Sequence, residues 1–358
     1  MEKILVYGMT DNAGGMESYV MTMYRNISKD VIQFDFVTDW QTMAYEDEVK
    51  KNGSAVYHIP KKSESLFGQF KAFSKILRKH KEYKKVYFNI MNAGAFLNML
   101  APILYGRNII VHSHNDFDEK VRLHKTFKGV MNFFADIKLA CSYGAAKHMF
   151  TKWDIKKENY TIINNAIEVE RFIFDNDKRQ EKRAELGIEN KFAVLHVGRI
   201  VNQKNPIFII DTFSELLKIK PDSVLLYVGA GDMEKQVKAR AEELGISASI
   251  QFLGERKDIP ELLFAADVFL FPSIFEGFGI AAIEAQAADL MCFVSDRLPK
   301  CVKTTEKICF LDVEQSASIW AKEIAEYQVK ERTNRADDIT RSGYNIKNEI
   351  EKLISIIK

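Results

Sequence analysis

Several features that would place this 358-residue chain in a special class are scarce or missing. No apolar run reaches the roughly 18 residues that a membrane span needs. The start, Met1 to Gly8, reads as a strand, because its apolar run is too short for a signal peptide. The net charge of +2 is too small to indicate a nucleic-acid-binding protein.

Cysteine is also rare, and its spacing excludes a common use of the residue. The chain has four cysteines, at Cys141, Cys292, Cys301 and Cys309. None of them stands in a Cys-x2-Cys pair, so a structural zinc site is not expected. Reduced thiols in an intracellular protein are the ordinary interpretation of such isolated residues.

What remains is a long chain of ordinary globular composition. A chain of 358 residues is too long to fold around a single hydrophobic core, so two domains are expected. A hydrophobic content of 47% argues against disorder. Strand and helix patterns alternate in both halves, as in strand Ala193–Val197 followed by helix Pro206–Ile219. This alternation predicts parallel sheets with right-handed crossovers. The charged stretch Ala166–Asn190, which has few apolar residues, is interpreted as a linker.

The most informative segment runs from Glu276 to Glu284. It follows a predicted buried strand, Val268–Phe271, and leads into a helical pattern, so two carboxylates bracket a helix N-terminus at the carboxyl end of a strand. Ligands bind at that edge in open α/β sheets, and glycines there let backbone amides approach a phosphate. Glu276 could then accept hydrogen bonds from sugar hydroxyls, and Glu284 could bind two ribose hydroxyls. The alternative is a glycine-rich turn with two solvated glutamates.

Here the sequence resembles a known family. Glu276 and Glu284 look like the E-x7-E motif of retaining glycosyltransferases with the GT-B fold, family 4 in particular, of the exopolysaccharide and capsular polysaccharide type. Further similar motifs follow in the family's order along nearly the whole chain: Gly14-Gly15-Met16-Glu17, His112-Ser113-His114-Asn115, Asn164-Asn165-Ala166-Ile167-Glu168, Val197-Gly198-Arg199 with Lys204, Val228-Gly229-Ala230-Gly231 and Phe252-Leu253-Gly254. None of these is specific alone, but six in register make the resemblance strong.

The resemblance implies two Rossmann-like domains with parallel sheets that face each other across a cleft. Residues 1–168 would form an acceptor-binding domain, and a C-terminal helix at about 343–358 would cross back to it. Residues 169–342 would bind the donor. The implied activity is that of a retaining hexosyltransferase, which moves a hexose or N-acetylhexosamine from a UDP-sugar to a glycan or lipid-linked sugar acceptor in bacterial surface polysaccharide assembly.

The resemblance also assigns roles to single residues. Arg199 and Lys204 would hold the diphosphate, because a guanidinium fork and an ammonium charge suit phosphate oxygens. His114 would contact the transferred sugar, with His112 as second choice, and Glu276 would complete the catalytic set. The expected donor-site residues are Gly15, Gly198, Arg199, Lys204, Gly229, Leu253, Glu276, Gly277, Phe278, Gly279, Ile280 and Glu284. The expected acceptor-side residues are Gly14, Gly15, Met16 and Asn165.

No metal or other cofactor is expected, because two cations and a helix N-terminus already face the diphosphate. Asp116-Phe117-Asp118 and Asp175-Asn176-Asp177 match a metal-binding Asp-x-Asp pattern, but such short patterns are frequent by chance. Nicotinamide binding through Gly229-x-Gly231 is not expected, since Glu234 stands where a third glycine belongs. The sequence departs from the family at Asp289, where relatives usually have a residue that is able to take a positive φ.

Charge is uneven along the chain. Residues 1–170 carry a net charge of +5 and the remainder −3. The excess lies in Gln69–Lys85 and Lys120–Phe134, where lysines accompany apolar residues at helical spacing. Such stretches can bind an anionic membrane surface. We therefore expect a cytoplasmic protein with peripheral contact to the inner face of the plasma membrane. The alternative is a helix with its apolar stripe in the core and its lysines in water.

Two other functions stay open at this stage. One is a nucleotide-sugar epimerase of the same fold, which would need no acceptor. The other is a non-catalytic subunit that binds a nucleotide sugar or a glycan and supports a partner enzyme. The complete set Glu276, Glu284, Arg199, Lys204 and His114 argues against the subunit, because a degraded relative would have lost some of these residues.

Overall fold

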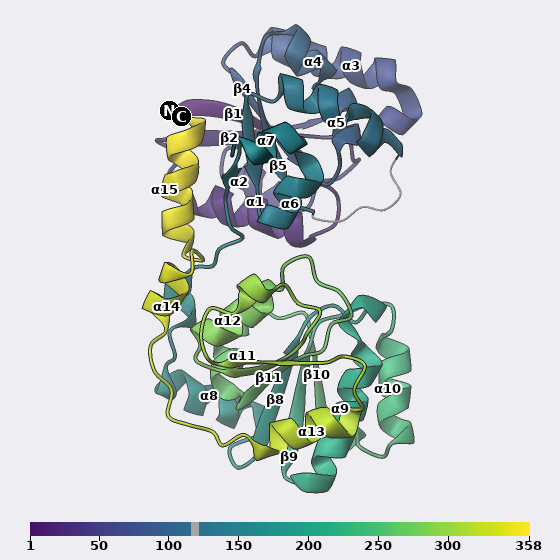
Figure 1. Ribbon diagram of the computed structural model, residues 1–358, viewed down its shortest axis with the longest axis vertical. Helices are drawn as coiled ribbons and strands as arrows, with labels where there is room; N and C mark the ends of the chain where they lie inside the picture. The colour runs from purple at the N-terminus through teal and green to yellow at the C-terminus, as the bar shows by residue number, and fades with distance from the viewer. Residues whose placement is uncertain (116–121) are drawn as a thin grey trace. The chain divides into compact units, whose positions relative to one another are not determined.

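The computed structural model describes residues 1–115 and 122–358, which form two compact units. The first unit comprises Met1–Ala166 with Ile346–Lys358, and the second comprises Ile167–Asn345. Each unit is built on one parallel sheet with helices packed against it (Figure 1). The predicted α/β class, with a Rossmann-like sheet in each half, is confirmed.

The sheet of the first unit has the strand order β3-β2-β1-β4-β5-β6-β7. Its strands are β1 (Glu2–Tyr7), β2 (Ile32–Thr38), β3 (Val56–His58), β4 (Lys85–Ile90), β5 (Asn108–Ser113), β6 (Ile137–Ala140) and β7 (Thr161–Ile162). Its helices are α1 (Gly15–Asn26), α2 (Glu46–Lys51), α3 (Lys62–Lys79), α4 (Phe96–Leu104), α5 (Arg122–Phe134), α6 (Tyr143–Met149), α7 (Lys152–Lys156) and α15 (Ile346–Ile357). The order reverses between β1 and β4, where ligands bind in open parallel sheets.

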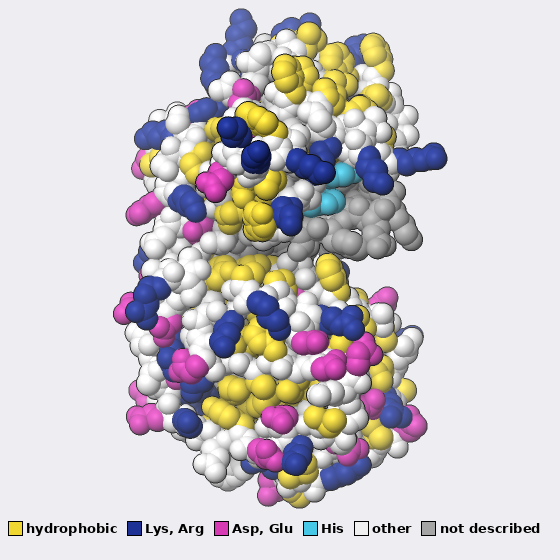
Figure 2. Space-filling model, viewed as in Figure 1, with side chains coloured by type: hydrophobic (Ala, Val, Ile, Leu, Met, Phe, Trp, Pro, Cys, Tyr) yellow, Lys and Arg dark blue, Asp and Glu magenta, His cyan; other side chains and the backbone are white. Residues whose placement is uncertain are grey.

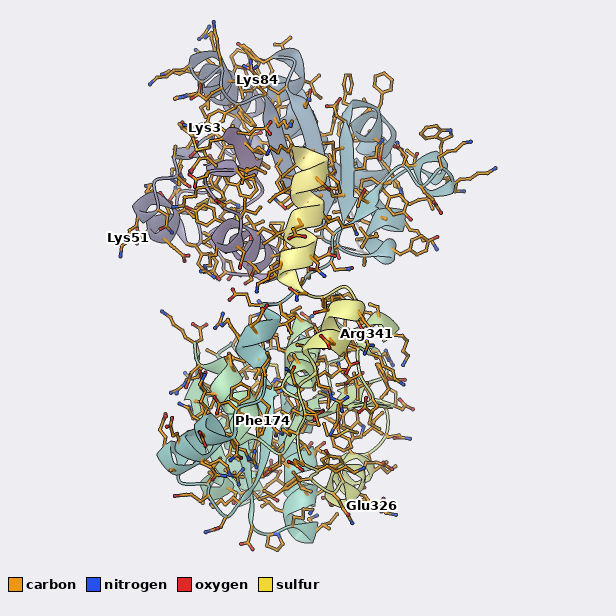
Figure 3. The ribbon with its side chains drawn as sticks, turned by 90° about the vertical axis from the view of Figure 1, so that its left-hand side faces the viewer. Lys3, Lys51, Lys84, Phe174, Glu326 and Arg341 are labelled. Carbon is orange, nitrogen blue, oxygen red and sulfur yellow. The ribbon has the colours of Figure 1, made fainter. Side chains whose placement is uncertain are left out.

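The last helix, α15, belongs to the first unit although it follows the second unit in sequence. Ile346, Ile350, Leu353 and Ile357 recur at helical spacing and are buried in a core shared with α1. In Figure 3 this helix crosses in front of the strands of the first unit. Lys85 Nζ donates to the carbonyl of Ile357 at 2.6 Å, so the helix end is bound to the start of β4.

The sheet of the second unit has the order β10-β9-β8-β11-β12-β13. Its strands are β8 (Phe192–Val197), β9 (Ser223–Val228), β10 (Ile250–Gly254), β11 (Val268–Phe271), β12 (Met291–Ser295) and β13 (Ile308–Leu311). Its helices are α8 (Asn176–Leu186), α9 (Pro206–Ile219), α10 (Glu234–Glu243), α11 (Ile259–Ala265), α12 (Ile280–Ala287), α13 (Ala317–Glu326) and α14 (Ala336–Arg341). The order reverses between β8 and β11, so their carboxyl ends flank the ligand-binding position of this sheet.

The sequence explains why these segments become central strands. β11 and β9 are buried along their whole length, and β8 is buried at its four middle residues. A parallel sheet covered on both faces needs such continuous apolar runs. Local signals set several helix starts: Pro206 stands in the first turn of α9, and the Ser142 hydroxyl caps α6 by accepting from Ala145 N at 3.0 Å.

The expected linker at 166–190 is wrong at its centre, where Asn176–Leu186 forms helix α8. Asp175 caps this helix by accepting from the amides of Asp177 and Lys178, which also accounts for the second Asp-x-Asp match. Arg183 is buried and pairs with Asp267 at 3.3 Å. The charged residues that suggested a linker are therefore partners of the rest of the unit.

The chain offers no helix suited to crossing a bilayer within the residues that the structure describes. The longest apolar stretch, Met91–Tyr105, contains α4, whose Met99 and Ala101 are buried in the first unit. Leu104, at the end of the same helix, is 70% exposed. This helix is therefore only partly the buried element that the sequence suggested.

Candidate functional site

In the second unit, the segment from Glu276 onward lies where the sequence placed it. Glu276 stands in the loop between β11 and α12 and is 8% exposed. Gly279 precedes α12 with φ +89, a conformation that favours glycine because it has no Cβ. Phe278 is buried against the ring of Tyr344 at 5.4 Å, and Ile280 packs on the same core. The side chains of Phe278 and Ile280 therefore anchor the loop to the core, and only their backbone remains to line the loop.

Lys204 and Glu276 form an ion pair between Lys204 Nζ and Glu276 Oε1. Lys204 follows β8, and its ammonium also lies 4.8 Å from the ring centre of Phe271, the last residue of β11. The two loops are further joined by Gln203, whose carbonyl accepts from Ile274 N and whose side-chain amide donates to Phe275 O, each at 2.9 Å. Both charges were predicted at this edge from the sequence, but no local pattern indicates that they pair.

Arg199 is the exposed cation of this edge. It lies two residues after the end of β8, and its guanidinium has no ion pair or hydrogen bond with any described residue. An unpaired guanidinium can bind an oxyanion without first breaking another contact. Of the two predicted diphosphate ligands, Arg199 is thus available, whereas Lys204 is held by Glu276.

Glycines allow the loops after β8 and β9 to lie against each other. A Cβ on Gly229, at φ +133, would stand 2.0 Å from Gly198 O, and one on Gly231 would stand 2.3 Å from Ile200 O. The β10 end joins the same set, because Gly254 O accepts from Gly229 N at 2.8 Å, next to Leu253. Gly277 and Gly198 have no side chain, so they leave the loop backbone uncovered by a Cβ near the Lys204–Glu276 ion pair.

Glu284, on α12, is partly buried. Burial raises the pKa of Glu284 to about 7, and the positive charge of Arg171 opposes that shift only in part. The carboxyl group therefore exchanges its proton near neutral pH. A partly buried carboxyl in the second turn of a helix that begins at the carboxyl edge of a parallel sheet suits a ligand with hydroxyl groups.

The first unit has its own cluster at the ends of β4 and β5. His114 directly follows β5, and its Nε2 lies 2.8 Å from Asn89 Oδ1 on β4. His112 is fully buried, and its Nδ1 lies 2.6 Å from the Tyr87 hydroxyl. The imidazole rings are 4.2 Å apart, and burial lowers the pKa of both, that of His114 to about 3. Both histidines are therefore neutral at physiological pH.

The predicted glycine loop precedes α1 in the first unit. Gly14 is the residue before the helix, and Gly15 and Met16 open it. Glu17 is buried and accepts from Thr10 N at 3.2 Å and Thr10 Oγ1 at 2.7 Å, so it closes the loop on itself. No role was predicted for Glu17 from the sequence, although a glutamate in the first turn of a helix is a recognisable signal for holding backbone donors.

Asn165 lies just before the end of the first segment of this unit, and its Oδ1 is buried without a partner among the described residues. Its neighbour Asn164 donates its backbone amide to Glu349 of α15 at 2.7 Å. The predicted residues thus fall into two clusters, one in each unit. Asp116, Asp118 and Lys120, which the sequence analysis also considered, lie outside the described residues.

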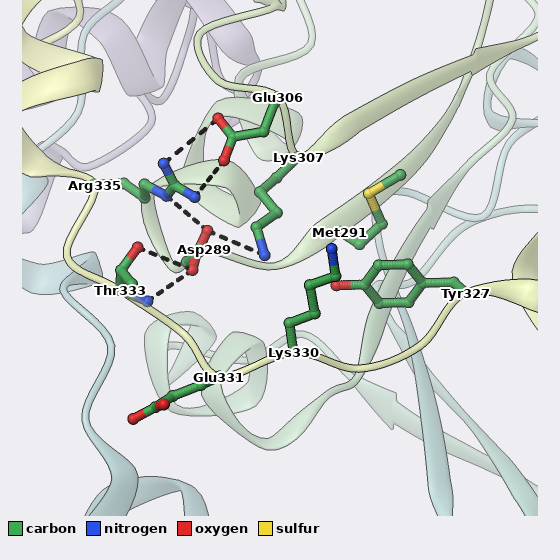
Figure 4. A pocket seen from close by; sticks show the side chains of 9 residues that line it. All are labelled: Asp289, Met291, Glu306, Lys307, Tyr327, Lys330, Glu331, Thr333 and Arg335. Atoms are coloured by element: carbon green, nitrogen blue, oxygen red, sulfur yellow. Dashed lines mark hydrogen bonds and ion pairs between the residues drawn. The ribbon is translucent and has the colours of Figure 1, made fainter.

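A cavity of about 300 Å³ lies elsewhere in the second unit. Figure 4 shows it beside Met291, the first residue of β12, and therefore at the amino edge of the sheet, opposite the edge that carries Glu276. Asp289 has φ +51, so it adopts the positive φ associated with this position in the family, and it accepts from Arg335 Nε and Thr333 N at 2.7 Å each. Through these hydrogen bonds Asp289 holds the 327–335 segment against the rest of the second unit.

Comparisons with known families match both units. Residues 13–171 match the family described as Glycosyltransferase Family 4, and residues 178–336 match the family described as Glycosyl transferases group 1. Together these two matches include every described residue of the two clusters.

Curated relatives resemble the chain along much of its length. A glycosyltransferase of Bacillus subtilis (strain 168) named EpsF is 25% identical over 96% of this chain and 93% of its own. The capsular polysaccharide biosynthesis glycosyltransferase CapH of Staphylococcus aureus is 26% identical over 76% of each chain. The UDP-Gal:alpha-D-GlcNAc-diphosphoundecaprenol alpha-1,3-galactosyltransferase of Escherichia coli is 30% identical over 62% of this chain and 60% of its own.

Solved structures agree on the fold. Alr3699/HepE of Anabaena in complex with UDP superposes with a TM-score of 0.78 at 18% identity, and the match covers 99% of each chain. At this identity the likeness concerns the fold alone. It extends over both units and supports the architecture that the sequence motifs implied.

Proposed function

We propose a donor, a mechanism and an acceptor for this chain, which belongs to the GT-B glycosyltransferases of the exopolysaccharide and capsule type. The donor is a UDP-sugar that carries a hexose or an N-acetylhexosamine. The acceptor is a glycan or a lipid-linked sugar. The observation that carries the proposal is the cluster of Arg199, Lys204, Glu276 and Glu284 at the switch point of the second sheet.

Transfer from a UDP-sugar breaks the bond between the anomeric carbon and the diphosphate oxygen. Negative charge grows on the departing diphosphate, and fixed positive groups aimed at that charge lower the barrier. Arg199 and Lys204 supply these groups, so the proposal assigns no metal ion. Glu276 accepts hydrogen bonds from hydroxyls of the sugar, and Glu284 binds the ribose.

In the retaining mechanism the acceptor hydroxyl attacks from the face that the diphosphate leaves. Its oxygen forms the new bond to the anomeric carbon, and its proton passes to an oxygen of the departing diphosphate. No protein base is then required, which suits His114, whose role here is contact with the transferred sugar. Gly14, Gly15, Met16 and Asn165 are assigned to the acceptor side.

Two named proteins support the choice of UDP. The Escherichia coli relative is named for transfer from UDP-Gal, and the Anabaena structure was solved with UDP. Both relate to this chain at a distance, so the nucleotide is part of the proposal. The relatives reported above are named as transferases, which favours transfer over epimerisation.

A lipid-linked acceptor would require contact with a membrane surface. On the first unit, α3, α4 and α5 expose Phe67 at 76%, Leu104 at 70% and Phe133 at 81%. Figure 2 shows apolar side chains beside lysines and arginines on the part of the molecule that carries these helices. We assign peripheral membrane contact to this exposed set, which we call the apolar surface.

The structure changes which residues of the two basic stretches belong to the apolar surface. In α3, Phe73 and Leu77 are buried in the core, so the middle of the Gln69–Lys85 stretch follows the alternative of a core-facing stripe with lysines in water. In α5, Val130 and Phe134 are partly exposed beside Phe133. The contact is therefore assigned to the start of α3, the end of α4 and α5.

The function is tested by calorimetric titration of wild type with UDP, GDP and ADP, followed by an assay for released UDP with glycan acceptors. Glu284→Ala is the test variant, and Glu314→Ala, an exposed glutamate of the same unit, is the matched control. UDP binding that weakens at least 10-fold in Glu284→Ala but not in the control supports the donor site, since a hydrogen bond to a charged group contributes about 1.5–3 kcal/mol.

Other results would point elsewhere. Preference for GDP or ADP keeps the fold and overturns the donor class. An isomerised nucleotide sugar without released UDP identifies an epimerase. Nucleotide binding without turnover on any acceptor favours the alternative function, that of a non-catalytic binding subunit. Absence of nucleotide binding by the folded protein rejects the donor site.

A further inference from the structure

The side chain of Asn89 determines how His114 meets a ligand. The contact joins His114 Nε2 and Asn89 Oδ1 at 2.8 Å. Both residues are fixed by the backbone as well: His114 N donates to Ile90 O at 3.1 Å, and a Cβ on Gly8 would stand 2.1 Å from Asn89 O. Asn89 itself is 2% exposed. The amide therefore has little freedom to turn away from the imidazole.

A neutral imidazole carries one proton, on either Nδ1 or Nε2. His114 is neutral, because burial lowers its pKa to about 3. The Asn89 Oδ1 atom can only accept, so the proton must sit on Nε2. Nδ1 is then left with a lone pair.

That lone pair has nothing to accept from among the described residues. His114 Nδ1 is buried without a hydrogen-bond partner, as are Asn89 Nδ2 and His112 Nε2 beside it. A buried acceptor without a partner destabilises a protein, and a ligand that brings a donor removes that penalty. A hydroxyl or an N–H group satisfies Nδ1, whereas a carboxylate has no proton to offer and is repelled by the lone pair.

We infer that Asn89 is a positioning residue that holds His114 as the Nε2-protonated tautomer, so that Nδ1 selects a sugar with a neutral hydroxyl and rejects one with a carboxylate in that place. The inference rests on the proposed function, in which His114 contacts the transferred sugar, and it places that contact at the primary hydroxyl. It narrows the donor to neutral hexoses, N-acetylated or not, and excludes glycuronic acids. Removal of the hydroxyl, as in a 6-deoxy sugar, should weaken the donor less than replacement by a carboxylate.

The tautomer is tested directly by nitrogen NMR of wild type labelled with ¹⁵N-histidine. We expect His114 to show a protonated Nε2 and an unprotonated Nδ1, and addition of the UDP-hexose should shift the Nδ1 resonance. A protonated Nδ1 in wild type overturns the inference, because Asn89 would then donate to the ring through Nδ2. This measurement needs no turnover, so it decides the tautomer even if the proposed function fails.

The selection is tested by kcat/KM for the UDP-hexose, its 6-deoxy form and the matching UDP-uronate. Wild type should lose roughly 10-fold on the 6-deoxy sugar and more on the uronate, as expected for an unpaired buried acceptor. In Asn89→Leu these ratios of kcat/KM should shrink to within about 3-fold. An imidazole that Asn89 no longer orients contributes only a weak hydrogen bond to the sugar. The matched control is Asn98→Leu, since Asn98 is also a buried asparagine of the first unit.

Equal kcat/KM on all three sugars in wild type overturns the selection, and equal ratios in wild type and Asn89→Leu overturn the role of Asn89. If Asn89→Leu fails to fold, the wild-type spectrum and the wild-type sugar series still decide. A wild type with the expected tautomer that neither binds UDP nor turns over any UDP-hexose rejects the proposed function instead.

Discussion

Lys204 and Glu276 are paired across the ends of two adjacent strands, β8 and β11. The side chains are 15% and 7% exposed, so the pair is shielded from water by its surroundings. One partner is the proposed ligand of the diphosphate and the other the proposed ligand of the sugar. A diphosphate therefore competes with Glu276 for the ammonium, and donor binding must rearrange a contact that also joins the two loops.

We expect loss of one partner of this pair to destabilise the second unit. Lys204→Met leaves the Glu276 carboxylate buried without its cation, and removal of one partner of a buried pair costs about 3–5 kcal/mol. The double variant Lys204→Met/Glu276→Gln removes both charges and should recover most of that stability while it stays inactive. Thermal unfolding of the single and double variants, with calorimetry, measures the difference.

The matched control for the pair is Lys238→Met, because Lys238 forms an exposed ion pair with Glu234 in the same unit. Exposed pairs contribute at most about 1 kcal/mol, so this variant should unfold near the wild-type temperature. Equal destabilisation by Lys204→Met and Lys238→Met would show that the Lys204–Glu276 ion pair contributes no more to stability than an exposed pair.

Arg199→Ala should separate binding from stability. Arg199 is exposed, and its guanidinium has no hydrogen bond or ion pair with any described residue, so the variant should keep the wild-type unfolding temperature. Its UDP affinity should fall about 10- to 100-fold, because a charge-assisted hydrogen bond to phosphate contributes about 1.5–3 kcal/mol. Calorimetric titration with UDP gives the result, and Arg297→Ala, an exposed arginine of the same unit, is the control. Unchanged UDP affinity in Arg199→Ala would remove Arg199 from the donor site.

Gly229→Ala should disrupt the joined loops of the second unit. Its Cβ would stand 2.0 Å from a backbone oxygen, which cannot move without displacing Gly198. Gly245→Ala is the matched control, since Gly245 also has a positive φ, +69, but open space around it. We expect the control to lose about 1 kcal/mol, the cost of a left-handed non-glycine residue. Gly229→Ala should lose clearly more and bind UDP weakly, and equal losses would contradict the clash.

The regular parts of the fold were readable because each depends on a local pattern. The strand predicted at Val268–Phe271 and the helix predicted at Pro206–Ile219 appear with these bounds, since continuous apolar runs and an N-terminal proline act within a few residues. Glu276 and Glu284 were found by their spacing around a helix start. Local spacing also identified His114 as the residue at a strand end.

Other features depend on residues far apart in sequence, and no local pattern reveals them. Helix α8 was missed because its charged side chains find partners about 80 residues away, such as Asp267 for Arg183. Asn89 escaped notice for the same reason, because its partner His114 lies 25 residues further on. Burial decides both cases, since the same residues in water would be ordinary polar side chains.

Phe133→Glu should strongly weaken binding to membranes if the apolar surface is the contact. Burial of a phenylalanine stabilises by about 1.5–3 kcal/mol, and a glutamate is repelled by anionic lipid. Co-sedimentation with vesicles of phosphatidylglycerol and phosphatidylcholine should show at least a 10-fold loss of affinity. Ile319→Glu introduces the same charge at an exposed apolar residue of the second unit and should bind as wild type does. Wild type that ignores these vesicles refutes the contact.

Glu284 should make the stability of the second unit depend on pH around neutrality. Its pKa is raised to about 7 in the folded protein, whereas a glutamate in an unfolded chain titrates near 4.3. Between these values the folded state holds a proton that the unfolded state has lost, so stability falls as pH rises from about 4.3 to about 7. The total change is about 4 kcal/mol at most, at 1.36 kcal/mol for each pKa unit.

Glu284→Gln removes this dependence, because the amide resembles the protonated carboxyl and does not titrate. At pH 5 the variant and wild type should unfold at similar temperatures, and at pH 8 the variant should be the more stable of the two. Calorimetry at both pH values measures the difference, and parallel curves would show that the carboxyl is not held at a raised pKa. UDP should nevertheless bind the variant more weakly at pH 8, since an ionised carboxylate accepts stronger hydrogen bonds from ribose than an amide does. This pair of results would assign Glu284 to ligand binding, because the stability of the fold alone would favour glutamine at this position.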